Sequence, residues 1–289
     1  MQWRFLNTGH QSPGMNMALD EAILLACEAG ISPPTLRVYG WQPPALSLGY
    51  AQSVPKEVNT AACRRYGIEI VRRPTGGRAV LHDDEVTYSV VMPITAPGGT
   101  SKTLTEHYHL IGLALAEAFT HLGLAVRLAR PPRSVKERQA PSPACFAALS
   151  RYELSVSGKK LVGSAQKRGQ HALLQHGSIP LSLDRQRLFQ CLRVPPEQHD
   201  ALVQEAYATM IAVSEAATAP IALHDIHAAL RHGFAITLAT PVIEGEVQPG
   251  EWQMARELYT SKYATAVWNY DGAAAWRQAR ATTQEDERA

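Results

Sequence analysis

The chain has 289 residues, of which 45% are hydrophobic and 19% are charged. These proportions are typical of a globular protein with one large or two small domains. The formal net charge of +2 is too small to indicate nucleic acid or a membrane as the main partner. The amino-terminal stretch MQWRFLNTGHQSPG has no apolar core of signal-peptide length, and the nearby run AILLAC is too short to span a bilayer.

The cysteines and histidines show no metal-binding pattern. Cys27, Cys63, Cys145 and Cys191 form no CxxC pair, so free thiols in a reducing cytoplasm are the simplest interpretation. None of the eleven histidines pairs with a cysteine at zinc-ligand spacing, and we therefore expect no metal site. Cys27 and Cys63 fall in helical patterns and are expected to pack in the core.

The first half of the chain predicts strands and helices in an irregular order. WRFLNTG indicates a strand, and Asn16 can cap a helix whose apolar face holds Leu19, Ala22, Ile23 and Ala26. Further strands are indicated at TLRVYGW, ALSLGY, IEIVRR, RAVLH and EVTYSVVM, with a short helix at VNTAACRRYG. A long helix follows at SKTLTEHYHLIGLALAEAFTHLG, and then a strand at AVRLAR.

The second half starts with an irregular segment, residues 131–150, that contains Cys145 and has prolines at positions 131, 132, 141 and 143. RYELSVSGKKLVGSAQKR then predicts a hairpin with SGKK at its turn, and ALLQHGSIPLSL predicts another strand. From Asp184 the pattern is mainly helical, including EWQMARELYTSKYATAVWNY, and the end TTQEDERA is polar. Because strands and helices do not alternate regularly, the sequence favours an α+β fold with an antiparallel or mixed sheet.

The segment RRPTGGRAVLHDDEVTYSV, residues 72–90, combines a glycine pair with basic side chains. Gly76 and Gly77 allow a turn with positive φ and a close approach of backbone to a ligand. Arg73 and His82 lie beside this turn. From these residues alone, a binding loop and a hairpin turn with an incidental charge cluster are equally good interpretations.

The segment SGKKLVGSAQKR, residues 157–168, places two lysines in a strand pattern. The side chains of Lys159 and Lys160 should point to opposite faces, so that one is solvated while the other enters a pocket. Gly163, Ser164 and Ala165 leave room beside the inward lysine. Composition alone favours the alternative, two surface lysines on a hairpin.

Two further residues are candidates on chemical grounds. His176 precedes Gly177 in LLQHGSIPL, although a hydrogen-bonded histidine at a strand kink is the more frequent explanation. Cys145 lies shortly before Lys160, and a nearby cation lowers the pKa of a thiol and favours the nucleophilic thiolate. A single cysteine in a loop is nevertheless more often incidental.

Together these segments resemble one superfamily. RRPTGGRAVLHDDEVTYSV is similar to the RRxxGGxxVxHD signature of the lipoate–protein ligase A and biotin ligase superfamily. GKKLVGSAQKR and LLQHGSIPL are similar to its lysine-bearing hairpin and following strand, in the same order. The resemblance spans residues 3–183 and implies the biotin/lipoate protein ligase catalytic-domain fold, with mixed sheets flanked by helices. We expect an acyltransferase catalytic domain at 1–183, its helical C-terminal part at 184–275 and a disordered tail at 276–289.

Two chemistries occur on this scaffold. Lipoate ligases use ATP to make an acyl-adenylate and need no catalytic cysteine, whereas LipM-type octanoyltransferases transfer an octanoyl group through a cysteine thioester. ACFAALSRYEL resembles the cysteine loop of the second type, and ARELYTSKYATAVWNY also fits one subgroup. The resemblance therefore implies octanoyl transfer, and a ligase that requires ATP and Mg is the alternative. A non-catalytic binder of lipoyl domains and a DNA-binding repressor fit the sequence less well.

The resemblance also implies a mechanism. Cys145 would accept the octanoyl group from octanoyl-acyl carrier protein and pass it to a lysine of a lipoyl domain, such as glycine cleavage H protein, without a cofactor. Lys160 would lower the pKa of the Cys145 thiol and polarise the thioester carbonyl. The expected substrate-binding residues are Arg73, Gly76, Gly77, His82, Gly163, Ser164, Ala165, His176 and Gly177. Val80, Val162 and Ala165 are candidates for the walls of an acyl tunnel or for plain core.

The segment RLARPPRSVKERQ, residues 127–139, carries five basic residues and one acidic residue. Acyl carrier proteins and lipoyl domains are acidic, so this segment could steer them towards the site. A solvated loop without a binding role is an equally good explanation. We expect the protein to be a monomer.

Overall fold

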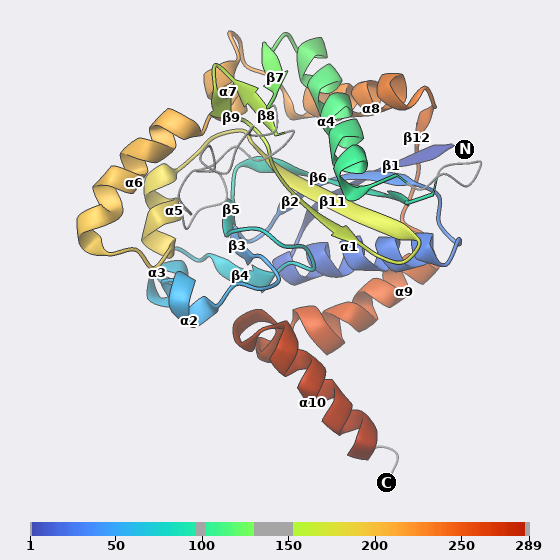
Figure 1. Cartoon of the computed structure of the whole chain (residues 1–289), viewed down its shortest axis with the longest axis vertical. Coiled ribbons are helices and arrows are strands. Elements are labelled where there is room, and N and C mark those ends of the chain that lie inside the picture. The colour runs from blue at the N-terminus through green and yellow to red at the C-terminus, as the bar shows by residue number, and fades with distance from the viewer. Residues whose placement is uncertain (1, 96–101, 130–152, 287–289) are drawn as a thin grey trace.

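The computed structural model describes residues 2–95, 102–129 and 153–286, with side chains up to residue 282. Its centre is a six-stranded mixed sheet (Figure 1). The strands of this sheet follow one another in the order β10 (Gly163–Arg168), β11 (Ala172–Pro180), β6 (Glu85–Pro93), β2 (Thr35–Trp41), β1 (Trp3–Gln11) and β12 (Val242–Glu244). β1 is parallel to both of its neighbours, whereas the pairs from β2 to β10 are antiparallel. The α+β class with a mixed sheet is therefore confirmed.

Two smaller sheets flank the large one. In the first, the central strand β3 (Ala45–Leu48) lies between β4 (Glu69–Arg72) and β5 (Val80–His82). In the second, the central strand β8 (Leu154–Val156) lies between β7 (Val126–Leu128) and β9 (Lys159–Lys160). The chain leaves β9 and enters the large sheet at β10, so the predicted hairpin is confirmed for β8 and β9 only.

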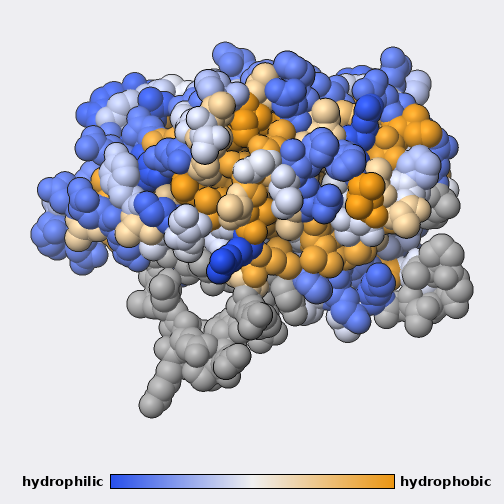
Figure 2. Space-filling model, turned by 90° about the horizontal axis from the view of Figure 1, so that it is seen from above, coloured by the Kyte–Doolittle hydropathy of each residue, from blue (hydrophilic) through white to orange (hydrophobic). Residues whose placement is uncertain are grey.

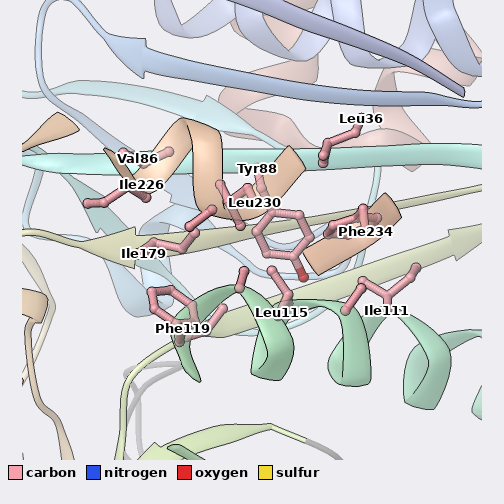
Figure 3. Packing of buried hydrophobic residues seen from close by; sticks show 14 of the residues in the cluster. Leu36, Val86, Tyr88, Ile111, Leu115, Phe119, Ile179, Ile226, Leu230 and Phe234 are labelled. Atoms are coloured by element: carbon pink, nitrogen blue, oxygen red, sulfur yellow. The ribbon is translucent and has the colours of Figure 1, made fainter. Parts of the chain in front are cut away.

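Two long helices, α4 (Leu104–His121) and α8 (Leu223–Leu238), cover one face of the large sheet (Figure 1). Tyr88 of β6 is wholly buried and points between them, as Figure 3 shows. Its apolar surroundings come from both helices and include Ile111, Leu115, Phe119, Ile226, Leu230 and Phe234. Viewed from the top of Figure 1, the surface is hydrophilic around a central apolar area (Figure 2).

The opposite face of the large sheet packs against α1 (Pro13–Glu28), which in turn packs against α9 (Pro249–Leu258). Because it lies between the sheet and α9, α1 is buried over most of its length. Its N-terminal cap is Ser12, followed by Pro13 at the first helical position, where proline is favoured. The prediction that Asn16 caps this helix is wrong. Asn16 lies inside the helix, and its amide donates to the carbonyl oxygen of Gly40 at 2.9 Å.

A third group of helices packs against the sheet that contains β3. Its members are α2 (Val54–Glu57), α3 (Thr60–Arg65), α5 (Arg185–Cys191) and α6 (Pro196–Thr209). Cys63 is buried in this core, and Cys27 is buried on α1, as the sequence predicts. The short helix α7 (Val213–Ala216) follows and contributes Val213 to the core under α4 and α8.

The C-terminal segment is bound to the body of the protein through Arg72. After α9 the chain forms two π-helical turns, η3 (Tyr259–Tyr263) and η4 (Val267–Asp271), where the sequence predicts a single helix. The buried guanidinium of Arg72 donates to the carbonyl oxygens of Trp268 and Asn269, and also to carbonyl oxygens of residues 49, 50 and 52. It therefore joins η4 to the loop that follows β3.

Two further elements differ from the sequence expectation. Residues Ala273–Asp286 form the helix α10, where a disordered tail is expected from residue 276. This helix begins with an Ala-rich stretch of high helix propensity, and Trp276 packs edge-on against Trp268. The edge strand β12 was not predicted, because only three residues pair and two of them are exposed. Within the described residues, no helix is both long and apolar enough to cross a membrane.

The contact between α4 and α8 depends on Gly233. A Cβ atom at this position would lie 2.4 Å from the carbonyl oxygen of Ala114 and 2.5 Å from the amide of Ala118. We therefore predict that Gly233→Ala forces the helices apart and lowers the unfolding free energy by about 1–3 kcal/mol, measured by urea denaturation. Gly250→Ala in α9 is the matched control, because no atom lies within 4 Å of its Cβ position. Equal stability of the two variants would contradict this close approach.

Candidate active site

A mostly apolar pocket lies between the large sheet, β5 and α1. Met17, Tyr39 and Trp41 line it and are almost fully buried. Gly163, Ser164 and Ala165 of the edge strand β10 line it as well. The remaining lining residues are Arg73, Val80, His82, Thr87, His176, Gly177 and Ser178.

His82 lines this pocket, and three contacts fix its ring. Its Nδ1 lies 2.8 Å from Glu85 Oε1, and its Nε2 lies 2.6 Å from Ser47 Oγ. The ring stacks on Trp41, with 4.1 Å between the ring centroids. Burial alone would raise the pKa of Glu85, but His82 and the hydroxyls of Ser178 and Thr87 together hold it below its usual value. Glu85 is therefore an ionised carboxylate that orients the polar groups around it.

His176 is held in the same way on a neighbouring strand. Its Nδ1 lies 2.9 Å from Asp20 Oδ2, and its Nε2 lies 2.7 Å from Thr75 Oγ1. Asp20 is wholly buried and also accepts hydrogen bonds from Arg37 and Tyr39. Both pocket histidines thus have a carboxylate at one ring nitrogen and a hydroxyl at the other. These contacts fix both rings in the wall of the pocket.

Arg73 supports the glycine turn. One of its guanidinium nitrogens donates to the carbonyl oxygen and the hydroxyl of Ser47, at 2.8 and 2.6 Å. The other donates to the carbonyl oxygens of Gly76 and Arg78, both at 3.0 Å. Gly77 has a φ of +99°, which confirms the predicted turn. A Cβ at Gly49 would lie 2.1 Å from the carbonyl oxygen of Gly77, so β3 and this turn are in close contact.

Because Gly177 has no side chain, the ring of Tyr88 can pack closely against β11 on the face of the sheet that α4 and α8 cover. A Cβ atom there would lie 2.5 Å from the ring of Tyr88 and 2.7 Å from the carbonyl oxygen of Gly163. Because this Cβ atom is absent, the Tyr88 hydroxyl can reach Ser164 Oγ at 2.7 Å. Gly177 therefore sets the position of the strand that carries Gly163 to Ala165.

Lys160 is buried, as expected for the inward lysine of the pair. Its side chain is 1% exposed, and its Nζ lies 2.8 Å from Glu153 Oε1. Lys159 is partly exposed and donates to the carbonyl oxygen of Tyr207 at 2.8 Å. The two side chains therefore point to opposite faces, as the strand pattern predicts. Lys160 is not among the described residues that line the pocket, but Gly163, which does line it, follows three positions later.

The structure brings most of the predicted site residues together. Seven of them line the pocket: Arg73, His82, Gly163, Ser164, Ala165, His176 and Gly177. Val80 also lines it, whereas Val162 packs in the core under α4 and α8. The predicted nucleophile Cys145 and most of the basic segment 127–139 lie outside the described residues.

The sequence analysis missed the polar groups that hold the two histidines. Asp20, Ser47, Thr75 and Glu85 bind the histidine rings, and Thr87 and Ser178 bind Glu85 in turn. The strands do carry a signal for part of this set, because Glu85, Thr87 and Ser89 alternate with apolar residues in EVTYSVV. Such alternation usually indicates a solvated face, but this face is buried against the pocket. No group of His, Cys, Asp and Glu in the described ranges could hold a metal ion.

Comparison with known proteins identifies the family. A model of the lipoyl protein ligase A/B catalytic domain matches residues 12–235. A bipartite lipoate protein ligase from Thermoplasma acidophilum has a similar structure, with a TM-score of 0.79 and 26% identity over 93% of this chain and 96% of that chain. The chain belongs to the lipoyl protein ligase A/B catalytic-domain family, which confirms the family and the fold expected from the three motifs.

Within this family, the chain is similar to proteins named octanoyltransferase LipM. The protein of that name from Kyrpidia tusciae is 45% identical over 93% of this chain and 98% of the relative. The one from Anoxybacillus flavithermus is 41% identical with the same two coverages. The likeness therefore extends over nearly the whole length of these relatives, including the C-terminal part.

His176 leads to a prediction about how the unfolding free energy depends on pH. Burial lowers the pKa of His176 below 6.5, although Asp20 opposes the shift. Below about pH 6.5 the unfolded chain binds a proton that the folded protein binds only at lower pH, so the unfolding free energy falls on acidification. Between pH 7 and 5, wild type should lose more unfolding free energy than His176→Gln, by at most ~1.4 kcal/mol per pH unit.

Urea denaturation at several pH values measures this difference. The contribution of Asp20 does not interfere, because its pKa is lowered from 3.8 and its stabilisation is lost only below that value. Parallel pH profiles for wild type and His176→Gln would show that the folded protein binds a proton at His176 as readily as the unfolded chain does.

Proposed function

We propose that this protein is an octanoyltransferase of lipoate biosynthesis, which transfers an octanoyl group from acyl carrier protein to a lysine of a lipoyl domain. The observation that carries the proposal is the apolar pocket, which is lined by residues of three motifs of the family and by the buried side chains Met17, Tyr39 and Trp41. Relatives named octanoyltransferase LipM, at 41–45% identity over nearly the whole chain, support the same acyltransferase activity.

The lining of the pocket suits an acyl chain. The hydroxyls of Ser47 and Thr75 and the polar hydrogens of Tyr39 and Trp41 are engaged by Glu85, Asp20, Thr87 and the two histidines. The walls therefore present mainly carbon to a ligand, and burial of methylene groups is the main source of affinity.

In the first step the thiolate of Cys145 attacks the carbonyl carbon of octanoyl-acyl carrier protein. A new C–S bond forms to Cys145, the C–S bond to the carrier breaks, and the carrier thiolate leaves. The exchange converts one thioester into another and so requires no ATP. The carrier thiolate takes up the proton that the Cys145 thiol released.

In the second step the neutral ε-amine of a lipoyl-domain lysine attacks the acyl-enzyme. A C–N bond forms, the C–S bond breaks, and the amine proton passes to the Cys145 thiolate. An amide is more stable than a thioester, and this difference drives the cycle forward. Neither step requires a metal ion or a cofactor, and the expected acceptors include glycine cleavage H protein.

Lys160 supplies positive charge next to this chemistry. Its ammonium group favours the Cys145 thiolate and stabilises the oxyanion that develops when either nucleophile adds to the carbonyl. Three features support this role: its burial, its pairing with Glu153, and its position three residues before Gly163 of the pocket. Both protein partners are acidic, so the basic segment 127–139 would steer them. We expect a cytoplasmic monomer.

An ATP-dependent lipoate ligase is the second candidate, because a ligase from Thermoplasma acidophilum shares the fold. Intact-mass spectrometry after mixing with octanoyl-acyl carrier protein distinguishes the two. We predict a hydroxylamine-labile octanoyl adduct on wild type without ATP, and loss of both adduct and transfer in Cys145→Ser. Transfer by Cys145→Ser that requires ATP would establish the ligase mechanism instead.

The adjacent lysines provide a matched pair for testing the role of charge. Lys160→Met removes the buried ammonium and should lower kcat by about 100-fold or more, the effect of removing one electrostatic stabiliser. Lys159→Met removes the partly exposed lysine on the opposite face and should stay within about threefold of wild type. The measurement is the rate of octanoyl transfer to a lipoyl domain, and equal effects of the two variants would exclude a special role for Lys160.

A further inference from the structure

Lys160 and Glu153 form an ion pair that is fixed by the backbone on both sides. The two charged atoms lie 2.8 Å apart, and the side chains are 1% and 2% exposed. The amide of Ala129 donates to the carbonyl oxygen of Glu153 at 2.8 Å. The amide of Ile211 donates to the carbonyl oxygen of Lys160 at 3.0 Å. The pair is thus built into the join between β7, β8 and β9, and is not a surface contact.

The charge state of a buried lysine decides what it can do chemically. Burial without a partner favours the neutral amine, which has a lone pair and is a strong nucleophile. A carboxylate at hydrogen-bond distance favours the ammonium form, which has no lone pair and cannot attack a carbonyl. Glu153 is a carboxylate at this distance from Lys160.

An enzyme that holds an octanoyl thioester must keep its own amines from consuming it. A neutral lysine in the same protein would attack the thioester with the advantage of an intramolecular reaction. The C–N bond would form, the C–S bond would break, and the amine proton would pass to the departing thiolate. The product, an octanoyl amide on the enzyme, would be permanent, because an amide does not return its acyl group to a thiol.

We propose that Glu153 is a positioning residue that protects Lys160 from acylation by keeping its amine protonated. The proposal rests on the proposed function, in which an octanoyl thioester forms next to Lys160. The same carboxylate thus serves two needs, since the positive charge that stabilises the Cys145 thiolate is also the state that cannot be acylated. The amine that accepts the octanoyl group then has to come from the lipoyl domain.

The test is Glu153→Gln, which keeps the shape of the side chain and removes its charge. The variant and wild type are incubated with octanoyl-acyl carrier protein and, separately, with octanoyl N-acetylcysteamine thioester, which does not depend on Cys145. We expect Glu153→Gln to gain one hydroxylamine-resistant octanoyl group on Lys160, located by peptide mass spectrometry, and to lose transfer activity as it does so. Wild type should show no such adduct.

Two further variants serve as controls. Glu153→Asp keeps a carboxylate with a shorter reach, so we expect it to fold and to acylate Lys160 more slowly than Glu153→Gln but faster than wild type. Glu21→Gln breaks another buried pair, in which Glu21 lies 2.6 Å from Lys262, and it should give no amide on Lys262. Thermal unfolding shows which variants are folded.

The possible results distinguish a failure of this proposal from a failure of the proposed function. An unmodified Lys160 in folded Glu153→Gln with both donors overturns the proposal. If Glu153→Gln does not fold, an unmodified Lys160 in Glu153→Asp overturns it equally. If wild type makes neither thioester nor product, the proposed function fails, whereas the small thioester still reports whether Glu153 protects Lys160.

Discussion

The buried carboxylate of Asp20 is the interaction on which the pocket depends. It lies on α1 and binds Arg37 and Tyr39 of β2 and His176 of β11, so that one ionised group joins a helix to two strands. Burial alone would raise the pKa of Asp20, but Arg37 and His176 together lower it. Removing one partner of such a pair costs about 3–5 kcal/mol, because a buried charge is left uncompensated. Glu85 on β6 has the same function on the opposite side of the pocket, with His82 as its partner.

These two carboxylates explain how polar residues can enclose an apolar space. Each of them collects the hydrogen-bond donors of its neighbours, so the pocket is left with ring faces, methyl groups and glycines. The reactive groups of the proposed mechanism are located elsewhere along the chain. Lys160 lies on β9 and is held by Glu153, and Cys145 belongs to the segment that precedes it. In the proposed mechanism the large sheet binds the acyl group, and Cys145 and Lys160 carry out the transfer.

The sequence predicted the strands and motifs well where a local pattern was sufficient. Alternation placed Lys159 and Lys160 on opposite faces, and the glycine pair marked a turn that the structure has at Gly77. The family resemblance brought Arg73, His82 and His176 to one site. Asp20, Thr75 and Glu85 were missed because their importance comes from partners up to 156 positions away in the chain. The helix start at Ser12 was misplaced because Asn16 is an equally good cap by residue type and differs only in its tertiary contacts.

The engagement of both ring nitrogens in each pocket histidine has a consequence for how such proteins diverge. Contacts within the protein already fix both rings, so the shape of the wall does not depend on the way in which an acyl group is activated. The same cavity could therefore hold the acyl group of an adenylate or of a thioester, if the segments outside it supply different reagents. A fold shared with a lipoate protein ligase at 26% identity is consistent with such a division.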